Sequence, residues 1–160
     1  MNYVYIRDLR RDDEERVLEI IHEVSWTSSA EDYPVEIIVH LLDHQYNRDW
    51  FRDIVTKQNR FAVIDEDTKL IVAIGGLKQN EIVNMFVAPD AQRKGVGTFL
   101  LVFLQKLAEF RGYSEVYLNS TITAMEFYLD NSFIVESQNE EEILSHRIVS
   151  YRMKYSIINH

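Results

Sequence analysis

The sequence contains no cysteine, and this absence alone removes several classes of chemistry. A chain without cysteine forms no disulfide bond, no thiolate metal site and no cysteine nucleophile. Long apolar runs are also missing, so no stretch reaches the length of a membrane span. The first eight residues, MNYVYIRD, lack the apolar core of a signal peptide. We therefore expect a cytoplasmic protein with no membrane partner.

Basic residues are fewer than acidic residues in this sequence. The chain has 17 basic and 26 acidic side chains, which gives a net charge of −9. A nucleic-acid surface depends on lysine and arginine, so we expect no nucleic-acid partner, whereas the acidic surplus permits attraction of cations. The length of 160 residues, without repeats or a linker, predicts one domain over residues 1–160.

The stretch around which the chain is organised runs from residue 81 to residue 133. The apolar run at 82–87 predicts a buried strand, which Pro89 ends. Gly95 and Gly97 follow, at the start of a helix with an apolar face. Glycines let a backbone approach a bulky anion, and a helix start supplies free N–H groups and a positive dipole end. Together these features predict a phosphate-binding loop.

Two familiar phosphate motifs do not fit this loop. A dinucleotide fingerprint needs a third glycine, where this chain has Leu100. A Walker A loop places its lysine after the glycine, whereas Lys94 precedes Gly95. An ordinary strand–loop–helix turn stays open on these residues alone.

Residues 92–97, QRKGVG, instead resemble the acyl-CoA pyrophosphate loop of the GNAT N-acetyltransferase superfamily, Gln/Arg-x-x-Gly-x-Gly/Ala. A second segment is similar to the family pattern Asn-x-x-Ala-x-x-x-Tyr-x-x-x-Gly-Phe. Here Ala124, Tyr128 and Phe133 match it, while Thr121 and Ser132 depart from it. Because glycine usually eases this turn, we expect backbone strain at Ser132 if its φ is positive.

The remaining pattern agrees with the family's order of elements. Strands are predicted at 3–9, 60–65, 70–77, 82–87, 114–118, 133–136 and 147–155, with a solvated acidic turn at 138–142. Helices fall between the first two strands and after the fourth and fifth. The resemblance implies an α/β (α+β) fold with a mixed, mostly antiparallel twisted sheet of about six to seven strands. Its parallel pair is formed by strands four and five, and helices cover both faces.

The resemblance implies an enzyme that moves an acetyl group from acetyl-CoA to a primary amine by direct attack. The acceptor stays open between a small-molecule amine and a peptide amine, and so does a homodimer, since many members of the family dimerise. The runner-up is a GNAT domain that binds acyl-CoA and regulates a partner protein without turnover. Intact Tyr128 and the intact loop favour the enzyme.

Specific residues take roles through the resemblance. Tyr128 resembles the tyrosine that donates a proton to the departing thiolate. Glu81 matches a glutamate that in some members acts as a base through water, and a solvated edge carboxylate is the alternative. The backbone N–H of Phe86 or Val87 is expected to face the thioester carbonyl. The residues expected to hold the pyrophosphate are Gln92, Arg93, Lys94, Gly95, Val96, Gly97 and Thr98.

In this family the acceptor usually binds at the first two helices and the loop between the last strands. These regions offer aromatic and acidic side chains that suit an organic cation. They are Trp26, Tyr33, Tyr46, Trp50 and the acidic residues 140–142. His40 and His44 lie one helical turn apart, but a third ligand is missing, so we predict no metal site.

Overall fold

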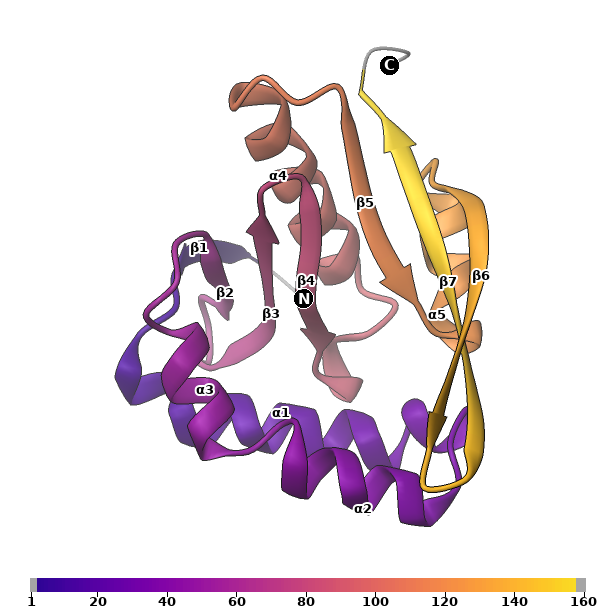
Figure 1. The fold of residues 1–160 in the computed structure, drawn as a ribbon. Coiled ribbons are helices and arrows are strands. Elements are labelled where there is room, and N and C mark those ends of the chain that lie inside the picture. The colour runs from indigo at the N-terminus through magenta and orange to yellow at the C-terminus, as the bar shows by residue number, and fades with distance from the viewer. Residues whose placement is uncertain (1–2, 158–160) are drawn as a thin grey trace.

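The computed structural model describes residues 3–157. Within these residues seven strands form one sheet in the order β1-β2-β3-β4-β5-β7-β6 (Figure 1). The strands are β1 (Val4–Asp8), β2 (Arg60–Asp65), β3 (Ile71–Lys78), β4 (Glu81–Val87), β5 (Glu115–Ser120), β6 (Ile134–Ile143) and β7 (His146–Ser156). Neighbouring strands run antiparallel except β4 and β5, which are parallel. This topology confirms the sheet predicted from the sequence.

Helices cover both faces of the sheet, as predicted (Figure 1). The α-helices are α1 (Glu14–Trp26), α2 (Val35–His44), α3 (Arg48–Ile54), α4 (Val96–Phe110) and α5 (Ile122–Asp130). Short 3₁₀ turns stand at Arg11–Asp13, Ser29–Glu31 and Pro89–Ala91. Between residues 3 and 157 no helix has the length and apolar character needed to cross a membrane.

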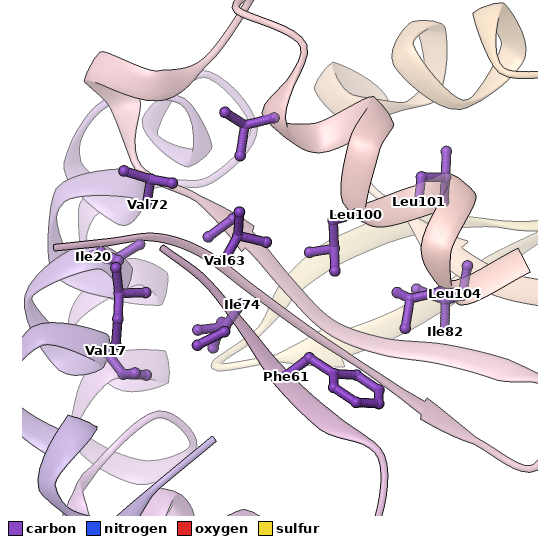
Figure 2. Close-up of a cluster of buried hydrophobic side chains, with 14 of the residues drawn as sticks. Val17, Ile20, Phe61, Val63, Val72, Ile74, Ile82, Leu100, Leu101 and Leu104 are labelled. Carbon is purple, nitrogen blue, oxygen red and sulfur yellow. The ribbon is translucent and has the colours of Figure 1, made fainter. Parts of the chain in front are cut away.

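The core is thickest around β3, where residues 71–77 are all buried. A strand covered on both faces reads as an unbroken apolar run, as this one does. Figure 2 shows Val17 and Ile20 of α1 on one side of the strands and Leu100 and Leu104 of α4 on the other. At Gly75 an added Cβ would lie 3.0 Å from Leu100 Cδ2. The close approach of α4 to the sheet therefore depends on this missing side chain.

A β-bulge distorts β4 just before its end. Ile74 pairs with Phe86, and Gly76 pairs with Val83, so one residue of β3 opposes two of β4. The first of those two, Asn84, has a φ of 56°. Asparagine tolerates the left-handed region better than most residues, and a bulge of this kind bends its strand.

The acidic turn predicted at 138–142 is wrong. β6 continues through these residues, and the chain turns at Leu144 and Ser145, whose φ values are 49° and 67°. Positive φ at both central residues is the usual geometry of a two-residue hairpin. β6 is an edge strand whose side chains are almost all exposed, so its sequence carries no alternation of apolar and polar residues. The periodicity used to recognise strands is therefore absent.

Candidate active site

The sheet opens between β4 and β5. The two strands pair at one position, Glu81 opposite Tyr117, and the Tyr117 N–H donates to the Asn80 carbonyl at 2.9 Å. Beyond that point they diverge (Figure 1). The later part of β4 therefore presents backbone groups that β5 does not pair. Since α4 follows β4 and α5 follows β5, both helices begin near the open end.

The N–H of Val87 in β4 points into this opening. The Ala88 N–H donates to the Val72 carbonyl of β3 at 2.9 Å. Successive N–H groups of a strand point to opposite sides, so the Val87 N–H is directed toward β5 and the Phe86 N–H toward β3. The Phe86 ring packs edge-on against Tyr46, with centroids 5.3 Å apart. Of the two predicted candidates, Val87 has the N–H with the suitable direction.

The loop after β4 presents several backbone N–H groups together. Arg93 and Gly95 have φ values of 61° and 85°, in the left-handed region. Among residues 3–157, no acceptor pairs with the N–H of Val96, Gly97 or Thr98 in the first turn of α4. An added Cβ at Gly95 would have nothing within 4 Å. This arrangement of free donors beside open space suits an anion.

Gly97 brings α4 against α5. An added Cβ there would lie 3.1 Å from Phe127 Cζ and 3.6 Å from Val87 Cγ2. The Phe127 ring in turn packs against the Tyr128 ring, with centroids 5.1 Å apart. Gly97 therefore serves close packing, whereas Gly95 serves the left-handed turn.

The polar side chains of the loop divide into two kinds. Arg93 and Lys94 are exposed and form no ion pair within the described part of the chain. Gln92 is engaged, because its Nε2 donates to the Val87 carbonyl at 3.1 Å and to Ser28 Oγ at 3.2 Å. The Gln92 amide thus fastens the loop to β4 and to the segment after α1. Contact of all three side chains with a pyrophosphate stays a prediction.

Tyr128 is buried on α5 with 9% of its surface exposed. Its ring packs against Phe127 and Phe133, with centroids 5.1 Å and 5.8 Å away. Burial raises the pKa of the Tyr128 hydroxyl to about 12, so the phenol is protonated at neutral pH. No hydrogen bond to this hydroxyl forms within residues 3–157, which leaves it able to donate to a ligand.

Thr121 and Ser132 differ from the second family pattern, yet the helix start and the turn that the pattern predicts are both present. Thr121 is the N-cap of α5, and its Oγ1 accepts from the Ala124 N–H at 3.2 Å. Ser132 has a φ of 71°, the positive value at which strain was expected. The Phe133 N–H donates to the Tyr128 carbonyl at 3.1 Å, which completes the turn that positions both rings.

Glu81 is held by a partner that sequence reasoning missed. Arg152 of β7 donates through Nη1 to Glu81 Oε1 at 2.9 Å. The same guanidinium lies 5.0 Å from the centroid of the Tyr117 ring and 3.5 Å from Asn119 Oδ1. The side chains of Glu81 and Arg152 are 33% and 29% exposed. Glu81 is therefore a fixed, partly buried carboxylate at the closed end of the opening, and not a freely solvated one.

The comparison with known families agrees with this geometry. Residues 29–157 match the sequence profile of the acetyltransferase (GNAT) domain. The chain belongs to the GNAT acetyltransferase family. Among curated protein sequences no significant match was found.

Solved structures share this GNAT fold over almost the whole chain. A GCN5-related N-acetyltransferase from Rhodopseudomonas palustris is 22% identical, with a TM-score of 0.87 and coverage of 98% of this chain and 97% of that one. The PaiA N-acetyltransferase of Thermoplasma acidophilum, solved with coenzyme A, is 20% identical, with a TM-score of 0.78 and coverage of 96% and 99%. The ribosomal-protein-S18-alanine N-acetyltransferase of Escherichia coli is 18% identical, with a TM-score of 0.70 and coverage of 97% and 94%.

On the side of α2, the GNAT domain carries a group of aromatic rings next to β4. Tyr46 packs edge-on against Trp50, with centroids 5.3 Å apart, and also against Phe86. Burial raises the pKa of Tyr33 to about 12, with a further contribution from the negative charge of Asp32. Trp26, by contrast, is 46% exposed at the end of α1.

Asp32 is the one acid of this region with a buried oxygen that lacks a partner within residues 3–157. Its Oδ2 has no hydrogen bond there, while Oδ1 accepts from Thr123 Oγ1 of α5 at 2.6 Å. A buried carboxylate oxygen without a donor suits a cationic ligand. The rings of His40 and His44 lie 4.7 Å apart, and the described residues contain no group of three metal-ligating side chains. The absence of a metal in this GNAT domain stays a prediction.

Proposed function

We propose that this GNAT domain transfers the acetyl group of acetyl-CoA to a primary amine by direct attack of the amine. One observation carries the proposal: the free N–H groups of Val96, Gly97 and Thr98 stand beside Arg93 and Lys94 where β4 and β5 separate. Donors and cations at a helix start suit a pyrophosphate. The unpaired edge of β4 suits the amide groups of a pantetheine arm, because an extended chain can take the place of a missing strand.

Backbone groups bind the donor in this proposal. The N–H groups of residues 93–98 donate to pyrophosphate oxygens, and Arg93 and Lys94 add charge. Gln92 keeps the loop attached to β4 through the Val87 carbonyl. The Val87 N–H donates to the thioester oxygen as that oxygen becomes negative. A preorganised donor stabilises the transition state most strongly at this stage, when the charge develops.

The amine nitrogen forms a bond to the thioester carbon as the carbon–sulfur bond breaks. The Tyr128 hydroxyl donates its proton to the departing sulfur, and the proton that the newly bonded nitrogen releases restores the phenol through water. The raised pKa of Tyr128 keeps the phenol proton in place at neutral pH, and its burial next to Phe127 fixes its direction. A general acid of this kind contributes roughly 10²-fold or more to a rate.

The amine must lose a proton before it attacks, because a free alkylamine has a pKa of about 10.4. In our proposal Glu81 accepts this proton through a chain of water molecules, because six residues of β4, roughly 20 Å, separate it from Val87. Arg152 holds the carboxylate at 2.9 Å and acts as a positioning residue. The acceptor is a cation in its resting state, so the rings of Tyr33 and Tyr46 and the free oxygen of Asp32 suit it.

Composition and family membership support further proposals about domain extent, location, partners and oligomeric state. We propose a single domain over residues 1–160, a cytoplasmic location and no nucleic-acid partner, given the net charge of −9. The acceptor is a small-molecule or peptide amine, and a homodimer is the oligomer to test first. Sedimentation at several protein concentrations measures that state directly.

A turnover assay tests the function. Purified protein is mixed with acetyl-CoA and a panel of primary amines, and the release of free thiol is followed. We expect thiol release that depends on both the amine and the protein. Binding of acetyl-CoA without turnover of any amine would favour the regulatory, non-catalytic domain, and failure to bind acetyl-CoA would contradict both.

A further inference from the structure

A second region of positive charge lies at the opposite end of α4 from the loop described above. A hollow of about 510 Å³ opens where β1 ends, β2 begins and α4 ends. Lys57, Arg60 and Arg111 line it, and Asp8 is the only carboxylate among the described residues that do so. On a chain with a net charge of −9, three cations around one hollow call for a physical explanation.

The Arg60 side chain is held in this hollow, and one of its N–H groups has no acceptor within residues 3–157. Its Nη1 donates to the Gln58 carbonyl at 2.9 Å, while its buried Nε finds no acceptor within residues 3–157. The stem of the side chain crosses Gly76, where an added Cβ would lie 2.5 Å from Arg60 Cδ. Gly76 thus provides the space that lets the guanidinium reach the hollow. A buried N–H without an acceptor is costly, and an oxyanion would satisfy it.

The other two cations differ in their partners. Arg111 donates through Nη2 to Asn59 Oδ1 at 2.9 Å, and this amide oxygen is neutral. Asn59 itself has a φ of 59° and accepts the Leu77 N–H at 2.9 Å, so the loop is fixed. Lys57 forms an ion pair with Asp53, whose Oδ1 lies 3.6 Å from the Lys57 Nζ. Neutral oxygens thus orient Arg60 and Arg111 without neutralising them, whereas Asp53 partly neutralises Lys57.

We propose that this hollow binds a small oxyanion with two or more negative charges, of the phosphate or polycarboxylate class. Planar guanidinium groups match the paired oxygens of both kinds of ion. The site is separate from the acetyl-CoA loop, because the 15 residues of α4 span about 22 Å between them. The proposal stands on the residues of the hollow and does not depend on acetyl transfer.

Phosphate is the first probe, and the acetyl-CoA loop is a competing phosphate site. The experiment therefore uses the full chain saturated with CoA, in which that loop is occupied. Inorganic phosphate, citrate and sodium chloride at matched ionic strength are titrated while backbone amide resonances are recorded. We expect saturable shifts at residues 57–60 and 111 with phosphate or citrate, and none with chloride. Whichever of the two ions binds more tightly identifies the class.

Variants show whether the arginines carry the binding. Arg60→Gln and Arg111→Gln are each expected to weaken it about tenfold, the value of a charge-assisted hydrogen bond. Arg60→Lys keeps the positive charge but loses the paired N–H donors of the planar guanidinium, so an intermediate affinity is expected. The control is Arg147→Gln on the β6–β7 hairpin, which removes one positive charge elsewhere and leaves affinity unchanged. Should Arg60→Gln fail to fold, Arg111→Gln at the exposed end of α4 still gives the answer.

Three results would overturn the proposal. One is a non-saturable shift equal to that caused by chloride. Another is unchanged affinity in a folded Arg111→Gln variant. The third is a phosphate response that appears only in a parallel titration of the CoA-free chain, is confined to residues 93–98 and is abolished by CoA, which would place phosphate in the acetyl-CoA loop alone.

Discussion

The two halves of the sheet are held together in different ways. On one side β3 pairs with both β2 and β4 along most of its length, and residues 71–77 are buried between α1 and α4. On the other side β5 pairs with β7 over all six of its residues, but with β4 at one position. Each half therefore has its own ladder of hydrogen bonds, and the sheet can stay open between them.

At the junction between the halves, the two strands are hydrogen-bonded at one end only. At that end Asn80 Nδ2 donates to the Glu115 carbonyl at 3.2 Å, and Arg152 of one half binds Glu81 of the other. At the other end Gly97 packs against Phe127, and the free N–H groups of α4 begin. Ligand-binding backbone is therefore available where two self-sufficient units meet, since neither unit needs it for its own ladder of hydrogen bonds.

The largest effect is expected from a charge placed in the open end. Gly95→Asp puts a carboxylate beside the proposed pyrophosphate, and like charges in contact cost several kcal/mol. Acetyl-CoA affinity should fall roughly 10³-fold. Gly95→Asn is the matched control, because it has the same shape and the same tolerance of positive φ without the charge. Calorimetric titration measures both, and equal affinities for the two folded variants would move the pyrophosphate elsewhere.

Tyr128→Phe should give the next largest effect. The substitution keeps the ring that packs between Phe127 and Phe133 and removes a hydroxyl that has no partner within residues 3–157. We expect kcat to fall roughly 10²-fold, while acetyl-CoA affinity and Tm change little. Tyr113→Phe, outside the site, controls for loss of a phenol. Wild-type turnover by a folded Tyr128→Phe protein would remove this residue from the mechanism.

Glu81→Gln should lower the rate less, and in a manner that depends on pH. Without the carboxylate, attack relies on amine that is already neutral, and that fraction grows toward the amine pKa of about 10.4. The loss should be at most about 10²-fold at neutral pH and should shrink as pH rises. Rates across pH 6 to 10 measure it. A profile that overlies the wild type would assign the proton to another residue or to bulk water.

The sequence predicted the buried parts of this molecule well. The apolar run at 82–87 and the helical repeat that includes Val96, Leu100 and Leu104 predicted β4 and α4, because burial imposes a period on the sequence. The glycine pattern likewise located the loop. The lone asparagine inside the β4 run was a usable sign of the bulge at Asn84.

The remaining features leave little local signal. Arg152 meets Glu81 across 71 residues of chain, and Gln92 meets Ser28 across 64. Such contacts depend on the assembled sheet, so no spacing in the sequence indicates them. The later part of the exposed edge strand β6, residues 137–143, was missed for a related reason, since a strand without a buried face has no alternation to detect.

The smallest effect concerns stability at high pH. The pKa of Tyr128 is about 12 in the folded chain and about 10 in an unfolded one, so the unfolded state loses its proton first. Tyr128 therefore stabilises the fold fully below pH 10, and this contribution is lost as the pH rises through 12. Between pH 9 and pH 11 the wild type should lose about 1 kcal/mol more than Tyr128→Phe. Urea titrations at the two pH values measure this difference, and equal losses would mean that the hydroxyl is not buried in solution.

The central claim is that acetyl-CoA binds in the opening between β4 and β5. Backbone amide resonances recorded during a titration with CoA test it most directly. We expect the largest shifts at residues 95–98 and at Val87, a smaller shift at Phe86, whose N–H is directed toward β3, and little change at residues 57–60. Saturating CoA that shifts amides elsewhere, or that leaves residues 95–98 unmoved, would contradict it.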